Sequence, residues 1–86
     1  MKKRKFNKGD ILAIEWWDAF SGNDWVAIDE ISEKYVIYSV GIFIFSKGTN
    51  LYLAQSICEK KIDEVSNYIA IPWGMIEDID ILRNKK

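Results

Sequence analysis

The chain has 86 residues, 49% of them hydrophobic and 29% charged, with a formal net charge of −1. This length fits one domain, and the composition is too apolar and too nearly neutral for a disordered chain. The single cysteine excludes an internal disulfide, and the absence of histidine excludes His-based triads and His metal sites. No apolar run approaches the roughly 18–20 residues of a membrane span, and no signal peptide is recognisable. We therefore expect a small cytoplasmic domain without membrane contact.

Five segments predict β-strands, because they are rich in β-branched and aromatic residues and are bounded by turn residues. They are residues 11–17, 35–45, 51–58, 67–71 and 77–82. Alternation in the first segment places Leu12, Ile14 and Trp16 on one face and Glu15 and Trp17 on the other. Gly41 favours a bend in the second segment, and residues 47–50 form a hairpin turn.

Residues 25–32 leave two interpretations open. Apolar residues at 25, 28 and 31 have helical spacing with Asp24 as a possible N-cap, which favours one short helix, but an irregular segment lying across a barrel is the alternative. The predicted fold is mainly β, a small and strongly bent antiparallel barrel of about five strands. Closing the sheet would remove edges that so short a chain cannot otherwise cover. Residues 9–82 form this domain, between basic tails at 1–8 and 83–86.

The near-neutral total charge hides an asymmetry. The N-terminal tail contains five basic residues and no acid, and these are Lys2, Lys3, Arg4, Lys5 and Lys8. Residues 9–82 carry thirteen acids against four lysines, so the body is strongly acidic. The basic cluster suits contact with nucleic-acid phosphates. A solvated, frayed tail is the favoured interpretation, because an acidic body repels the nucleic acid that the tail attracts.

The loop after the first strand carries the most unusual composition. Three tryptophans fall within ten residues, and each buried indole N–H needs a partner, so at least one ring is expected outside the core. An exposed Trp beside carboxylates suits stacking on a planar base or a cation. The candidate ligand-binding residues are Trp16, Trp17, Asp18, Asp24, Trp25 and, in a turn near this region, Trp73. The alternative is that Trp17 packs under the Trp25 segment in a second, minor core.

Catalysis is poorly supported by this sequence. It contains no activated nucleophile and no metal-ligand pattern, so we expect a protein that is not an enzyme and binds no metal or cofactor.

Several motifs resemble those of a known group of proteins. Gly9–Ala19 (GDILAIEWWDA), Trp25, Ser39–Gly41 (SVG) and Ile71–Ile76 (IPWGMI) occur in this order. The same order is similar to that of a group of short uncharacterised bacteriophage and prophage proteins, which implies phage origin and no known enzymatic activity. The Ile71–Ile76 segment before a last strand also resembles the end of SH3-like barrels. Gly74 and Met75 replace the Asn-Tyr pair of peptide-binding SH3 domains, so proline-rich ligands are not expected.

Three noncatalytic functions follow from these features. The first is a phage accessory protein that binds a host protein or a small ligand through the aromatic–acidic loop, one version being counter-defence by sequestering a nucleotide-derived signal. The second is a small nucleic-acid-binding barrel that uses its basic tails. The third is a structural or assembly role in the virion. Because strands 11–17 and 35–45 are apolar on both faces, we also expect a homo-oligomer.

Overall fold

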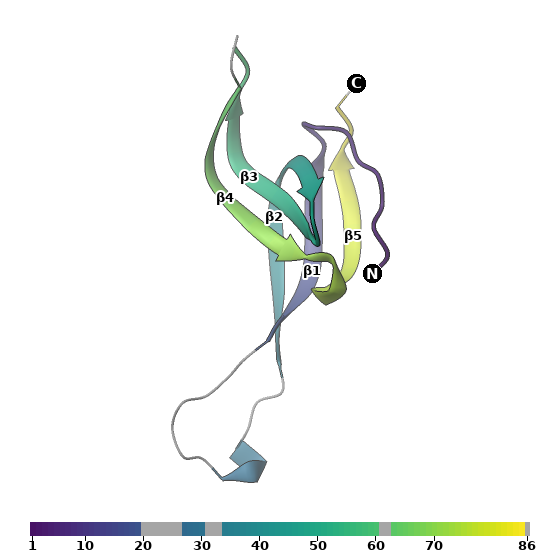
Figure 1. Cartoon of the computed structure of the whole chain (residues 1–86), viewed down its shortest axis with the longest axis vertical. Helices are drawn as coiled ribbons and strands as arrows, with labels where there is room; N and C mark the ends of the chain where they lie inside the picture. Colours follow the sequence, from purple (N-terminus) through teal and green to yellow (C-terminus); the bar gives the residue numbers. More distant parts are fainter. Residues whose placement is uncertain (20–26, 31–33, 61–62, 86) are drawn as a thin grey trace.

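The computed structural model describes residues 1–19, 27–30, 34–60 and 63–85. Five strands form one antiparallel sheet in the order β4-β3-β2-β1-β5 (Figure 1). They are β1 (Ile11–Ala19), β2 (Lys34–Lys47), β3 (Asn50–Cys58), β4 (Glu64–Pro72) and β5 (Ile76–Arg83). The predicted mainly β, antiparallel architecture is confirmed. β4 and β5 do not pair with each other in the described parts of the chain, so this sheet is not closed into a barrel.

Two single 3₁₀ turns accompany the strands. η1 (Ile28–Glu30) follows the first strand, and η2 (Trp73–Met75) joins β4 to β5. Pro72 ends β4 because proline has no N–H to donate to a ladder, and the predicted turn after it is confirmed. Of the predicted segment 25–32, the structure describes residues 27–30, which contain this one turn, and the remainder lies outside the described residues.

β2 changes its pairing partner along its length. Its first half pairs with β1 as far as Ile42, opposite Ile11, and from Ile42 onward it pairs with β3. The change of partner falls beside Gly41, where a bend was predicted. A bulge follows between Phe43 and Phe45. The sheet therefore turns at this point, and the β3–β4 hairpin diverges from the first half of β2 (Figure 1).

The core lies on the face that this bend encloses. Leu12, Ile14 and Trp16 of β1 are buried, as the alternation predicted. They meet buried residues from each of the other strands and from η2, namely Phe43, Leu51, Leu53, Ile71, Trp73, Ile76 and Ile79. Alternation thus assigned the inward face of β1 correctly, and the opposite face of that strand is left toward solvent.

Residues 1–10 pack against the sheet. The segment runs beside β5 (Figure 1), where the Arg4 guanidinium donates to the Ile79 carbonyl at 3.5 Å. Phe6 lies over the core, with its ring centroid 5.5 Å from that of Phe43 and stacked on Trp73 at 6.5 Å. The terminal amine donates to the Trp73 carbonyl at 3.1 Å. This segment therefore contributes to the hydrophobic core as well as carrying charge.

Ser39→Ala is expected to lower the free energy of unfolding by about 1–2 kcal/mol, because it leaves a buried donor without an acceptor. The Trp16 indole N–H donates to the Ser39 hydroxyl at 3.0 Å, and Trp16 is only 8% exposed. Urea denaturation followed by tryptophan fluorescence measures the change. Ser56→Ala, at an exposed position of β3, serves as the control. Equal stability of the two variants would contradict this account of Trp16.

Candidate functional site

Two of the predicted ligand-binding tryptophans belong to the core. Trp16 is buried against Ser39, and Trp73 is only 3% exposed beneath Phe6. The expectation that a tight turn exposes Trp73 is wrong. The η2 turn points inward, because the Trp73 backbone N–H donates to the Thr49 carbonyl at 2.9 Å and the indole fills the space under the N-terminal segment. Neither ring is available to a ligand from solvent.

The remaining predicted residues divide into two pairs. Trp17 is half-buried and Asp18 is exposed, both near the end of β1, and Trp17 lies opposite Val36 of β2. Asp24 and Trp25 lie outside the described residues. Trp17 therefore lies at one end of the outer sheet face, and Asp18, the next strand residue, points to the opposite face. The four described residues of the predicted six-residue site do not come together.

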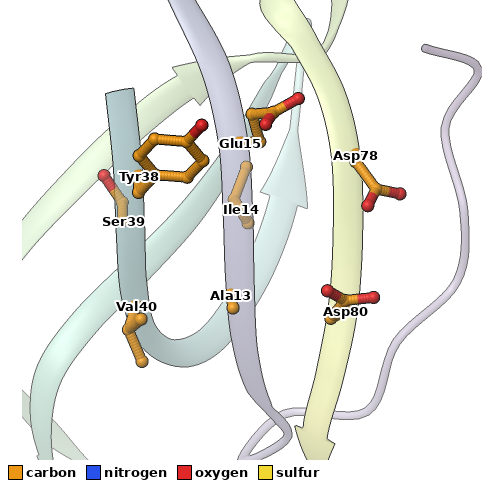
Figure 2. Close-up of a pocket in the computed structure, with 8 residues that line it drawn as sticks. All are labelled: Ala13, Ile14, Glu15, Tyr38, Ser39, Val40, Asp78 and Asp80. Atoms are coloured by element: carbon orange, nitrogen blue, oxygen red, sulfur yellow. The ribbon is translucent and has the colours of Figure 1, made fainter. Parts of the chain in front are cut away.

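A different surface is assembled on that outer face, and we call it the acidic–tyrosine face. The register pairs Ala13 with Val40 and Asp80, and Glu15 with Tyr38 and Asp78. Side chains from three neighbouring strands thus share one side of the sheet, around a shallow hollow of about 130 Å³ (Figure 2). Tyr38 is 75% exposed and Val40 66% exposed, so a tyrosine and a valine lie open to solvent among three carboxylates.

The Tyr38 phenol is oriented by Glu15. Its ring leans from β2 toward β1, with the hydroxyl on the side of Glu15 (Figure 2). The hydrogen bond to Glu15, followed by the negative charge of that carboxylate, raises the pKa of Tyr38 above its ordinary 10.0. The phenol is the donor in this bond, and ionisation would remove it. At neutral pH the phenol is protonated and can donate this hydrogen bond.

Glu15→Gln is expected to bring the pKa of Tyr38 back toward 10.0, because the carboxylate charge and much of the hydrogen-bond strength are lost. The pKa of Tyr38 is higher in the folded state than in the unfolded state. The hydrogen bond to Glu15 therefore stabilises the fold below pH 10, and its contribution is lost as pH rises through the pKa of the folded state. NMR titration of the tyrosine Cζ resonances measures the shift. An unchanged Tyr38 titration in the variant would contradict the assigned hydrogen bond.

The predicted basic residues lie along a separate groove. Lys3, Arg4, Lys5 and Lys8 line a hollow of about 630 Å³ between the N-terminal segment and residues 43–46 of β2, whereas Lys2 is exposed outside it. The Lys3 ammonium donates to the Gly48 carbonyl at 2.6 Å, and Lys8 forms an ion pair with Asp63. Lys3 is therefore held against the β2–β3 turn, and Lys8 against the start of β4.

The acidic–tyrosine face was missed because its residues come from separate parts of the sequence. Alternation in 77–82 places Asp78 and Asp80 on the side opposite Ile79, which is 4% exposed. The pairing of β5 with β1 then brings these two acids beside Glu15 and Tyr38. These residues become neighbours only through the order of the strands in the sheet, which the sequence pattern does not indicate.

Within the described parts of the chain, no cluster of three acidic or cysteine side chains has an arrangement that could hold a metal ion. In the same parts, no helix is long and apolar enough to cross a membrane. Comparison with protein-family models, curated proteins and solved structures found no match to this chain.

Proposed function

We propose that this chain is a non-enzymatic accessory protein, encoded by a phage and acting in the host cytoplasm, that binds a host protein through the acidic–tyrosine face. The observation that carries the proposal is the exposed Tyr38 on the β2 side of this face, which hydrogen-bonds Glu15 of β1, with Asp78 and Asp80 beyond β1 on β5. The phage origin is supported by the motifs at 9–19, 39–41 and 71–76.

The chemistry of the face favours a cationic protein surface. Exposed tyrosine is enriched at protein interfaces and often contributes a large share of the binding energy. The three carboxylates complement lysine or arginine side chains of a partner and steer its approach. A hollow of about 130 Å³ is small beside the roughly 300–1,000 Å³ of small-molecule sites, and its acids repel phosphates. Sequestering a nucleotide-derived signal is therefore not supported at this face.

Self-association through this face is less favourable than a cationic partner. A face-to-face pair sets Glu15, Asp78 and Asp80 of one copy against the same acids of the second copy. Within the described residues, β3 pairs with β2 only from Ile42 onward, so residues 36–41 of β2 form a sheet edge on that side. Two copies that pair along this edge keep their acids apart. The expected homo-oligomer is therefore proposed for that edge alone, and sedimentation velocity at micromolar concentration tests it.

We also propose that the sheet is an SH3-like barrel that is open between its outer strands. Three features support this proposal: β1 lies between β2 and β5, β2 is shared by both halves of the sheet, and a single 3₁₀ turn connects β4 to β5.

Site-specific photo-crosslinking tests the docking proposal. A photoreactive phenylalanine analogue is placed at Val40 on the face, and at Ser66, an exposed residue of β4, as the control. We expect a discrete host protein to crosslink at position 40 and not at 66, and the triple reversal Glu15→Lys, Asp78→Lys, Asp80→Lys to lower its yield at least tenfold. Equal capture at the two positions, or capture unaffected by the reversal, would overturn the proposal.

A further inference from the structure

Three exposed or half-exposed aromatic rings form a row across β2, β3 and β4. The rings of Phe45 and Tyr52 meet edge to face with centroids 5.1 Å apart, and Tyr68 continues the row at 6.3 Å from Tyr52. Phe45 and Tyr68 are exposed, Tyr68 to 66%. Core packing does not account for Tyr68, because two thirds of this side chain contacts solvent. The row therefore offers ring faces to a ligand.

The row lines a groove of ligand-sized volume. All three rings line a hollow of about 410 Å³, together with Lys8, Lys47 and Asp63. It meets the hollow of about 630 Å³ beneath the N-terminal segment, because Lys8, Ile44 and Phe45 line both. The combined surface, which we call the aromatic–lysine groove, is thus longer than a single small-molecule pocket. It shares no residue with the lining of the acidic–tyrosine face.

The charge of the groove is positive although the body of the chain is acidic. Its basic lining residues are Lys3, Arg4, Lys5, Lys8 and Lys47, and Asp63 is its one acidic lining residue within the described residues. The hydrogen bond from Lys8 lowers the pKa of Asp63, so this ion pair persists at neutral pH and offsets one positive charge. The fold therefore separates a cationic groove from the acidic face of the sheet.

We propose that the aromatic–lysine groove binds short single-stranded nucleic acid. Bases stack on Phe45, Tyr52 and Tyr68, and phosphates contact the lysines and Arg4 along the N-terminal segment. Single strands suit this surface because their bases are free to stack, and a positively charged groove that carries aromatic side chains is the usual means of binding them without sequence preference. The positive charge alone would also suit an acidic peptide, but the row of three rings favours stacked bases. The length of the groove favours several linked nucleotides over one free nucleotide.

Fluorescence anisotropy with a labelled ten-nucleotide oligothymidylate tests the proposal. We expect Tyr68→Ala to weaken binding about tenfold through the loss of one stacked base. Tyr38→Ala, which removes an exposed tyrosine from the acidic–tyrosine face, is the matched control and is expected to leave binding unchanged. Affinity is also expected to fall steeply as salt rises, because phosphate contacts release counterions.

A gain-of-function variant keeps the test independent of folding defects. Asp63→Ala removes the acid that neutralises Lys8, so we expect binding to tighten severalfold. Weaker or unchanged binding of this variant, an equal effect of Tyr68→Ala and Tyr38→Ala, or equal affinity for a duplex of the same length would overturn the proposal. Competition by adenosine monophosphate at the same concentration as the oligonucleotide would overturn it in favour of a free-nucleotide site. None of these results bears on docking at the acidic–tyrosine face.

Discussion

Replacing Asp10 with alanine is expected to lower the free energy of unfolding by about 2–5 kcal/mol, because two hydrogen bonds to a buried, charged acceptor are lost. Asp10 is 2% exposed, and its carboxylate accepts hydrogen bonds from the backbone N–H groups of Asn7 at 2.9 Å and Lys85 at 2.7 Å. The carboxylate thereby ties both chain ends to the start of β1. The total free energy of unfolding of a domain of this size is roughly 4–13 kcal/mol, so the expected loss is a large share of the stability.

Urea denaturation monitored by circular dichroism measures this loss. Asp10→Asn is expected to fall between wild type and alanine, since its single amide oxygen can accept only one of the two donors well. Asp18→Ala is the control, because Asp18 is exposed on β1. Similar stabilities of the Asp10→Ala and Asp18→Ala variants would contradict the role given to Asp10.

Gly41→Val is expected to destabilise the protein by about 2–3 kcal/mol through crowding of the core. A Cβ at position 41 would lie 3.0 Å from the Leu53 Cβ and 3.1 Å from the Ala54 carbonyl oxygen. Neither neighbour can move freely, since both residues are buried in β3. At this position β2 also stops pairing with β1 and begins to pair with β3. The added side chain would therefore distort the bend that encloses the core.

Thermal denaturation compares this variant with Gly74→Ala. Gly74 is exposed in the η2 turn, and a Cβ added there meets nothing within 4 Å, so little change is expected. If Gly41→Val were as stable as Gly74→Ala, close approach of β2 and β3 would not be the reason for a glycine at 41.

The strands were predictable because their signals are local. Alternation in β1 identified Leu12, Ile14 and Trp16 as its inward face, and all three are buried. In β5 the same pattern separates Ile79 from Asp78 and Asp80. Two connections were predicted, a hairpin turn at 47–50 and a turn that contains Trp73, and the structure has a hairpin and a 3₁₀ turn there. Period-two patterning thus specified the elements and their facing sides.

The candidate sites were less predictable because they depend on which strands become neighbours. Trp73 appeared suited to the surface as a turn residue, but Phe6, 67 residues earlier, covers it. Residues 1–8 were expected to form a solvated tail, whereas Phe6 packs on Phe43 and Trp73. Such contacts between distant segments leave no periodic pattern in either segment. Composition alone therefore did not show that Trp16 and Trp73 belong to the core, whereas Trp17 does lie outside it.

The central claim is that a host protein docks on the acidic–tyrosine face. Its most direct test is isothermal titration calorimetry of the host protein identified by crosslinking, in free form, against variants of this face and of the aromatic–lysine groove. We predict that Tyr38→Ser weakens binding about 30-fold, as loss of an exposed interface tyrosine can, and that Tyr68→Ala leaves it unchanged. Wild-type affinity in the Tyr38→Ser variant, with the same affinity after reversal of Glu15, Asp78 and Asp80 to lysine, would contradict the assignment of this face as the docking surface.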